Sequence, residues 1–164
     1  MNSALLVKSL ISYYLAGMIT MRFSKPNFKT RTFEGKPQLF DPVRNKWVIF
    51  QSEEWVRQNV IKWLMEEKGV PISFISIEKT IQVGELSKRF DILVYDRSHQ
   101  PWMMIECKAQ EIPLDESVLM QVLRYNLAIP VPYVVITNGN ICFAAEKSQG
   151  TEKWLSALPA FPHI

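Results

Sequence analysis

The chain has 164 residues, a formal net charge of +3, and 48% hydrophobic and 21% charged residues. This length is enough for one domain with its own core, and the composition is that of an ordinary globular protein rather than a disordered or fibrous one. Two cysteines and two histidines are too few, and too far apart, for a zinc site, a disulfide framework or a histidine-based catalytic triad.

Residues 1–20 are strongly apolar, with Lys8 as their one charged residue. The stretch is short for a membrane span and lacks the basic start of a secretory signal. We therefore expect a cytoplasmic protein that does not cross a membrane. Three alternatives stay open for this stretch: a docking helix, a self-association helix that supports a homodimer, or an over-long reading frame whose true start is Met18 or Met21.

Residues 22–51 combine three prolines with interleaved charges, which predicts an irregular arm with one short strand at 47–50. Seven basic and two acidic residues lie between Arg22 and Lys46. Such an arm could track a phosphate backbone, with Lys29 and Arg31 among its contacts. The alternative is a solvated tail.

A helix is predicted after the arm, because apolar residues recur with helical period from Val56 to Leu64. Ser52 can cap its start, and Gly69 followed by Pro71 should end it. Three strands are then expected at roughly 73–83, 89–95 and 102–109, with turns at Gly84 and 96–101.

The second half of the chain predicts one more helix and a hairpin. The helix begins at Asp115 or Ser117 and is ended by Pro130 and Pro132. Asn138-Gly139 separates two apolar runs, at 133–137 and 140–144, and this dipeptide is the strongest short hairpin signal. A last short helix is expected near Trp154.

Three charged residues interrupt segments that otherwise have the pattern of buried strands. Asp91 lies in the apolar run 89–95, and Glu106 and Lys108 follow the apolar run 102–105. Buried charges need a partner or a metal ion. Alternate residues of a strand share a face, so Glu106 and Lys108 should project from one side and Cys107 from the other, into the core. Two carboxylates on adjacent strands form a hard oxygen site that suits magnesium, and a lysine beside them can orient a metal-bound water.

These features together resemble the PD-(D/E)XK nuclease superfamily. More narrowly, residues 52–145 resemble the N-terminal nuclease domain of type I restriction enzyme R subunits. The motifs that carry the resemblance are Glu53-Glu54-Trp55-Val56-Arg57-Gln58, Asp91, Glu106-Cys107-Lys108, Gln121-Val122-Leu123-Arg124-Tyr125 and Thr137-Asn138-Gly139. One departure is that Phe90, not proline, precedes Asp91.

The resemblance implies an α/β fold, in which a restriction-endonuclease-like mixed sheet is flanked by helices (an αβββαβ core). It places the nuclease domain at 52–150, after an apolar segment and basic arm at 1–51 and before a C-terminal tail at 151–164.

The resemblance also implies roles for single residues. Asp91, Glu106 and the backbone carbonyl of Cys107 would bind Mg²⁺, with Mn²⁺ as a substitute, and Lys108 would position the attacking water or stabilise transition-state charge. Glu54, with Glu53 as the alternative, would be the helix acid. The remaining implied residues are Gln121 and Tyr125, which would order the site or contact the DNA backbone, and the phosphate contacts Arg57 and Arg124.

Each of these residues also has a purely structural interpretation. Asp91 could pair with Arg89 or Lys88, and Glu106 could pair with a lysine across the strands. Lys108 could be an exposed lysine at a strand end, and Glu54 could only favour the helix dipole.

The expected function is that of a magnesium-dependent DNA endonuclease related to restriction. No phosphate-binding loop of the G-x-x-x-x-G-K-[ST] type occurs in the sequence, so we expect the domain to borrow a motor, act without one, or do something else. The resemblance implies DNA as a partner, together with the motor or specificity subunits of a restriction system. The alternative is a catalytically silent nuclease fold that binds nucleic acid or protein. The choice between DNA and RNA, the sequence specificity and the oligomeric state stay open.

Overall fold

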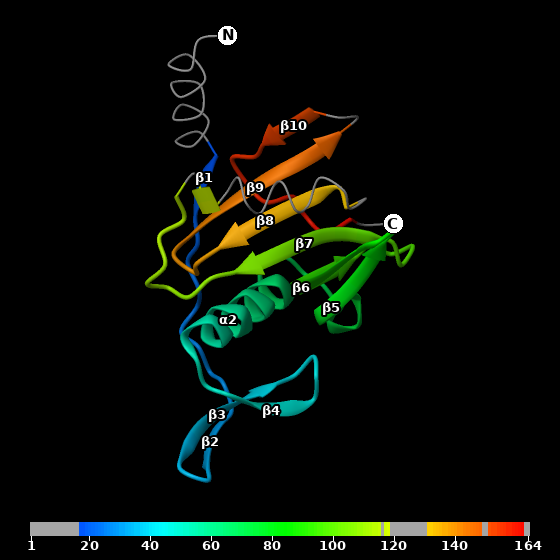
Figure 1. The fold of residues 1–164 in the computed structure, drawn as a ribbon. Helices are drawn as coiled ribbons and strands as arrows, with labels where there is room; N and C mark the ends of the chain where they lie inside the picture. Colours follow the sequence, from blue (N-terminus) through cyan, green and yellow to red (C-terminus); the bar gives the residue numbers. More distant parts are fainter. Residues whose placement is uncertain (1–16, 116, 119–130, 149–150, 163–164) are drawn as a thin grey trace.

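A computed structural model of the chain describes residues 17–115, 117–118, 131–148 and 151–162. Within these residues a seven-stranded sheet carries the helix α2 (Ser52–Glu66) on one face, and a separate three-stranded sheet lies beyond the helix (Figure 1). The strands of the large sheet are β1 (Met18–Thr20), β5 (Ile75–Val83), β6 (Leu86–Tyr95), β7 (Pro101–Cys107), β8 (Tyr133–Thr137), β9 (Ile141–Ser148) and β10 (Thr151–Trp154).

The large sheet is mixed, as predicted. Its order is β1-β9-β8-β7-β6-β5, and β10 also pairs with β9. Strands β5, β6 and β7 form an antiparallel meander, β7 and β8 are parallel, and β8 and β9 form the predicted antiparallel hairpin. A parallel pair needs a crossover. Here the crossover contains 119–130, so most of the predicted second helix lies outside the described residues, but Asp115 Oδ1 accepts the Val118 N–H at 3.0 Å, as a helix cap does.

Helix α2 holds one face of the core. Val56, Val60, Ile61 and Leu64 recur at helical spacing and are almost fully buried, in one cluster with residues of β6 and β7 such as Ile92 and Ile105. Each such side chain stabilises the fold by about 1.5–3 kcal/mol relative to exposure. Packing of this stripe orients the other side of the first helical turn, which carries Glu53 and Glu54.

The two ends of α2 differ in how well they were predicted. At the C-terminal end Gly69 has a φ of 65°, and the Val70 N–H donates to the Leu64 carbonyl at 3.0 Å, which confirms Gly69 as the stop. At the N-terminal end the cap residue is Gln51, and Ser52 makes no cap bond. The prediction for Ser52 was wrong because its hydroxyl donates instead to Glu111, at 2.6 Å.

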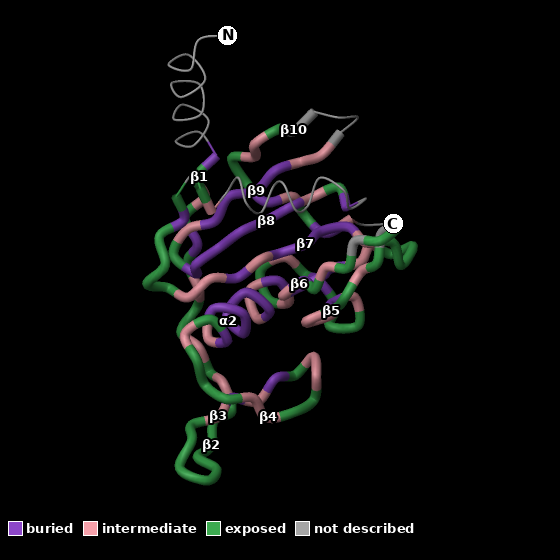
Figure 2. The backbone as a smooth tube through the Cα atoms, viewed as in Figure 1, coloured by how far each residue is buried: buried purple, intermediate pink, exposed green. Residues whose placement is uncertain are grey.

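The opposite face of the sheet has a second apolar cluster. It includes Phe90 and Leu93 of β6, Met104 of β7, and Ile136 and Phe143 of the β8–β9 hairpin. Figure 2 shows the resulting pattern, in which buried backbone runs along β7, β8 and β9 and through α2, while the β2–β3 turn is exposed. The central strands are therefore covered on both faces, which explains their nearly continuous apolar runs.

Of the irregular arm predicted for residues 22–51, the short strand at 47–50 is confirmed, but the irregular structure expected before it was wrong for 30–41. Three antiparallel strands, β2 (Thr30–Phe33), β3 (Lys36–Asp41) and β4 (Lys46–Ile49), form the smaller sheet there. Glu34 and Gly35 both have positive φ values, of 49° and 72°, as a tight hairpin turn requires. Pro37 indicated a break, but it lies near the end of β3 beside this turn, where a missing donor is tolerated.

The C-terminal segment also differs from the prediction. The expected short helix near Trp154 is the strand β10, because residues 151–154 pair antiparallel with β9. Leu158 and Phe161, in the predicted tail, are buried in the α2-side core. The large sheet thus recruits β1 and β10 from outside 52–150. Strand β5 begins later than predicted, after a short 3₁₀ turn, η1 (Ile72–Phe74). No helix among the described ranges is long and apolar enough to cross a membrane.

Candidate active site

The candidate catalytic residues lie at one end of the β6–β7 pair. Ile92 pairs with Ile105, so the next step of the antiparallel register sets Asp91 opposite Glu106. Lys108 follows the last residue of β7, and its N–H donates to the Thr137 carbonyl of β8 at 2.8 Å, which anchors the backbone there. Neighbouring strands therefore bring Asp91 and the Glu106-Cys107-Lys108 triplet together.

Glu106 and Lys108 are in direct contact. Lys108 Nζ lies 3.2 Å from Glu106 Oε1, and both side chains are partly exposed. Strand alternation predicted that the two would share a side, and the contact confirms it. A partly exposed carboxylate and amine at a strand end can both reach a bound substrate.

Asp91 is held by two donors. Its Oδ2 accepts the Cys107 N–H at 2.8 Å, and its Oδ1 accepts Arg57 Nη2 at 2.9 Å. Arg89 pairs with Glu78 instead, so it is not the partner that the structural interpretation of Asp91 proposed. The Cys107 N–H lies between Glu106 and Lys108 in the chain, so the carboxylate of Asp91 touches the backbone of the triplet itself.

An irregularity in the β5–β6 ladder turns Asp91 toward α2. Ile77 pairs with Ile92 and Lys79 with Phe90, and the ladder skips Glu78 and Asp91 between them. Glu78 has a φ of 53°, in the left-handed region. Phe90 and Leu93 are three residues apart yet pack in one cluster, so the alternation of side chains shifts between them. This local irregularity accompanies the contact between the Asp91 side chain and Arg57 of α2.

Arg57 connects Asp91 to the first turn of α2. It is 6% exposed, and besides Asp91 it contacts Glu54 Oε2 at 2.6 Å and Glu53 Oε1 at 3.0 Å. Its Nε is buried with no partner among the described residues. The resemblance implied that Arg57 would contact phosphate. The structure differs because Arg57 faces β6 across the helix packing, where three carboxylates gather around it.

Glu54, rather than Glu53, is the buried acid in the first turn of α2. It is 9% exposed, and its Oε1 accepts Arg44 Nη2 at 2.8 Å and Gln58 Nε2 at 2.9 Å. The side chain of Glu53 is far more exposed. Among the described contacts, Glu54 is linked to Asp91 through Arg57, which pairs with both. Glu54 therefore helps to position Asp91, which is more than an interaction with the helix dipole.

Arg44 is a residue of this network that sequence reasoning missed. It lies in the turn between β3 and β4, and it pairs with Asp41, Glu54 and Glu78. Asp41 is fully buried, and its Oδ1 also accepts the N–H groups of Val43 and Arg44. The one signal was an aspartate followed by proline, which indicates a turn, but nothing in the sequence places that turn against α2.

Comparison with known proteins decides the family. Residues 52–162 match the family described as type I restriction enzyme R protein N terminus. The chain belongs to this family. The match runs from α2 through β10, so it contains Glu54, Asp91 and the Glu106-Cys107-Lys108 triplet, while β2, β3 and β4 precede it.

Two curated proteins show weaker likeness to this restriction-family chain. The serine–tRNA ligase of Bartonella tribocorum is 24% identical over 135 residues, and that of Bartonella quintana is 25% identical over 135 residues. In both cases the alignment covers 77% of this chain and 31% of the relative. The chain thus spans about a third of the length of these relatives.

The oxygen atoms of the restriction-family site fit a hard divalent ion. An ionised carboxylate has about four lone-pair positions, so Asp91 keeps acceptor capacity beyond its two hydrogen bonds. Glu106 and the Cys107 carbonyl add oxygens of the kind that Mg²⁺ prefers. No three His, Cys, Asp or Glu side chains within the described ranges are gathered to hold a metal, and the expected set uses only two.

Cys107 is a core residue, as predicted. It is fully buried in the α2-side cluster, and burial raises the pKa of its thiol well above the usual value. Cys142 is also a free thiol, and burial raises its pKa to about 12. Neither sulfur is a nucleophile at neutral pH, because the reactive form is the thiolate.

The electrostatics of the site show a surplus of negative charge at Glu106. Burial raises the pKa of Glu106, and the charge of Asp91 raises it further against the opposing effect of Lys108. Burial lowers the pKa of a second amine, Lys88, while the charge of Glu106 opposes that shift. Lys88 therefore lies near the same carboxylates, and a cation in this place would relieve the repulsion between them.

This surplus of negative charge at Glu106 predicts that the stability of the fold depends on pH. Glu106 has a raised pKa in the folded state, so folding favours its neutral form. Stability should fall as pH rises from 4.5 through the raised value, because the unfolded chain releases that proton first. We therefore compare Glu106→Gln with wild type in the presence of a chelator. The variant should be more stable than wild type at a pH of about 7 to 8, and the two proteins should be equally stable at about pH 4. Urea unfolding at both pH values checks this, and a constant difference would contradict it.

Five of the residues singled out from the sequence are not among the contacts described above. Gln121, Arg124 and Tyr125 lie outside the described residues, and their expected roles stay predictions. Lys29 and Arg31 belong to the small sheet, where Arg31 is exposed.

Proposed function

We propose that this chain is a divalent-metal-dependent deoxyribonuclease domain that hydrolyses phosphodiester bonds in a restriction system. The observation that carries the proposal is the hydrogen bond from the Cys107 N–H to Asp91 Oδ2, together with the Lys108–Glu106 contact at 3.2 Å. The first contact links the acid of β6 to the backbone of the β7 triplet, and the second links the acid and the amine of that triplet to each other. Membership of the restriction R protein family supports the same reaction class.

Each residue would have a distinct part in hydrolysis. Asp91, Glu106 and the Cys107 carbonyl would hold Mg²⁺, which when bound supplies Lewis acidity and lowers the pKa of water. Lys108 would orient the attacking water or stabilise charge on the phosphate oxygens. Glu54 acts through Arg57, which fixes the Asp91 carboxylate, so both are positioning residues.

Metal binding can be tested without any activity. Addition of Mn²⁺ or Mg²⁺ at about 100 times its Kd stabilises a protein by about 2.7 kcal/mol, or several degrees in Tm for a chain of this size. We expect this shift in wild type and little of it in Glu106→Gln, which removes a ligand but leaves the Arg57 contacts intact. Glu67→Gln, an exposed glutamate after α2, is the matched control and should shift like wild type. A full shift in Glu106→Gln would contradict the assignment.

Activity is tested by nicking of supercoiled plasmid with the purified chain, in Mg²⁺ or Mn²⁺ and in chelator. Metal-dependent nicking supports the proposal. An unchanged plasmid under every metal condition would favour the second candidate, a silent binding module. One observation favours that candidate: both oxygens of Asp91 already have partners inside the protein.

The name of the serine–tRNA ligases points to RNA, so a single-stranded RNA substrate belongs in the same assay. Ligase activity is not proposed, because the alignment covers only 31% of either relative. Motor or specificity subunits and a homodimer stay proposals for the partners of this domain.

A further inference from the structure

The three-stranded sheet has an inner and an outer face of different composition. Leu39 and Asp41 of β3 are fully buried, which identifies the inner face. Residues of the other parity, together with their cross-strand partners, form the outer face. We name this set the outer face: Lys29, Arg31, Phe33, Lys36, Gln38, Phe40, Trp47 and Ile49.

Cations and aromatic rings form a continuous row on the outer face. Lys29 Nζ lies 5.7 Å from the Phe40 ring, and Phe40 packs edge-on to Trp47 with ring centroids 5.4 Å apart. The Arg31 guanidinium lies 4.4 Å from the Trp47 ring and 5.1 Å from the Phe33 ring. Gln38 Oε1 accepts Arg31 Nε at 2.7 Å. The row is therefore ordered before anything binds, which reduces the entropy lost on binding.

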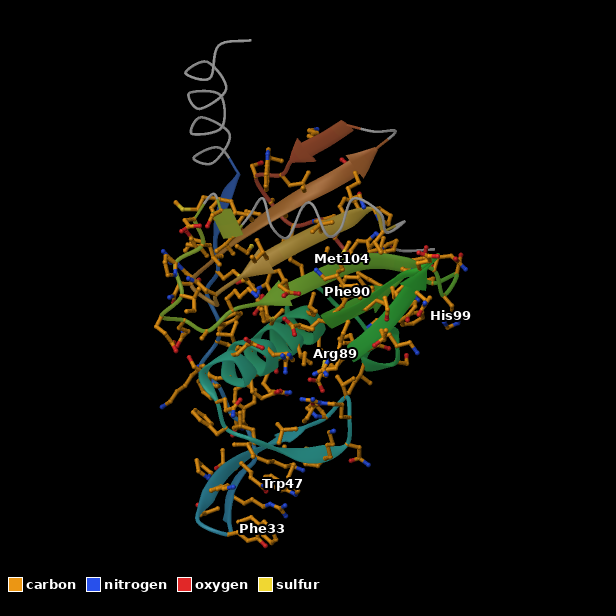
Figure 3. All side chains as sticks on the ribbon, in the orientation of Figure 1. Phe33, Trp47, Arg89, Phe90, His99 and Met104 are labelled. Carbon is orange, nitrogen blue, oxygen red and sulfur yellow. The ribbon has the colours of Figure 1, made fainter. Side chains whose placement is uncertain are left out.

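The outer face leaves large apolar groups in water. Phe33 is 50% exposed and Ile49 is 46% exposed. Figure 3 shows Phe33 and Trp47 on the small sheet, at the end of the molecule away from the large sheet. Exposed large apolar groups within one patch are typical of an interaction surface rather than of an inert one.

Charge identifies the kind of partner. The outer face carries the cations Lys29, Arg31 and Lys36, and the three strands contribute no carboxylate to it. Asp41, the single acid within the strands, is on the inner face and is paired with Arg44. A polyanion with flat, apolar rings can pair with the cations and also pack against the aromatic groups. An ordinary protein surface can pack against the aromatic groups but does not pair with the cations.

We infer that the outer face binds single-stranded DNA. Cations contact the phosphates, and the rings of Phe33 and Trp47, with the Arg31 plane, stack against unpaired bases. A duplex does not fit this chemistry, because its bases are stacked inside and show only their edges. The inference rests on the proposed function and adds to it a substrate that carries an unpaired strand as well as the bond to be cleaved.

The network at the candidate active site ties this surface to the reaction. Asp41 and Arg44 connect the small sheet to Glu54, and Arg57 connects Glu54 to Asp91. A strand on the outer face is thus held at a defined position relative to Asp91. Strands β2, β3 and β4 precede the family match at 52–162, so this chain joins the surface to the family's own site.

Fluorescence polarisation of labelled oligonucleotides with the full chain in chelator tests the inference. A 20-nucleotide thymine strand, a duplex of the same length and the uridine RNA strand are compared. Wild type should bind the DNA strand most tightly. Phe33→Ala should weaken that binding about tenfold, and Trp47→Ala by at least as much, because stacking is worth about 1–3 kcal/mol per base. Arg31→Ala should lower the slope of log affinity against log salt by about 0.7.

The matched control variants remove the same kind of group, an exposed cation or an exposed apolar side chain, from a place outside the outer face. Lys153→Ala removes an exposed cation on β10, and Ile72→Ala removes an exposed apolar group before β5. Both should bind like wild type. Phe33 is half exposed, so its variant folds even if Trp47→Ala does not.

Three outcomes would overturn the inference: unchanged DNA-strand binding in Phe33→Ala, duplex binding as tight as strand binding, or tighter binding of the RNA strand. Its failure is distinct from failure of the proposed function. If the protein binds the strand through Phe33 but never nicks plasmid, only the proposed nuclease function is contradicted. If the protein nicks plasmid but all variants bind the strand equally well, only the inference about the outer face is contradicted.

Discussion

Lys108→Ala should lower the metal-dependent nicking rate by a factor of about 10² to 10³, the usual cost of removing one group that stabilises transition-state charge. The fold should survive, because the Lys108–Glu106 pair is partly exposed and such pairs contribute about 0–1 kcal/mol. Initial nicking rates in Mg²⁺, with Tm measured on the same samples, check both expectations.

Matched variants separate the role of Lys108 from a general loss of positive charge. Lys79→Ala removes an exposed lysine on β5, and it should nick at the wild-type rate. Lys108→Arg keeps the charge but cannot give up a proton, so partial recovery indicates charge stabilisation and no recovery indicates proton transfer. Wild-type rates in Lys108→Ala would rule out the proposed site and point to a contaminating nuclease.

Arg57→Ala should lower the free energy of unfolding by about 3–5 kcal/mol, because removal of one member of a buried ion pair leaves uncompensated charge behind. Here the abandoned groups are Glu54 and Asp91, with Glu53 at the edge. Arg57→Lys should restore little, since one ammonium cannot replace a planar fork that serves three carboxylates. Urea unfolding at neutral pH measures the loss.

A lysine of the same helix provides the comparison. Lys62 pairs with Glu66 across 3.8 Å near the surface, and Lys62→Ala should cost about 0.3–0.5 kcal/mol. In a double-mutant cycle Asp91→Asn should make Arg57→Ala less costly by more than about 0.5 kcal/mol, as expected for groups in contact. A loss below about 1 kcal/mol in Arg57→Ala would show that the network does not stabilise the fold.

Local pattern was sufficient for much of the fold. The helical period between Val56 and Leu64 predicted α2, and Asn138-Gly139 predicted the β8–β9 hairpin. Strand alternation placed Glu106 and Lys108 on one side and Cys107 in the core. These features depend on residues a few positions apart, where spacing along the backbone sets direction.

The pairing of charges that are far apart in the sequence could not be predicted from such local spacing. Asp91 meets Arg57 rather than Arg89, its neighbour in sequence, because an irregularity at Glu78 and Asp91 in the β5–β6 ladder turns Asp91 toward α2. Strand β10 replaces the expected helix because β9 offers an open edge to pair with. An ion pair or an edge strand depends on which remote segments the core brings together, and a single sequence carries no local record of that packing.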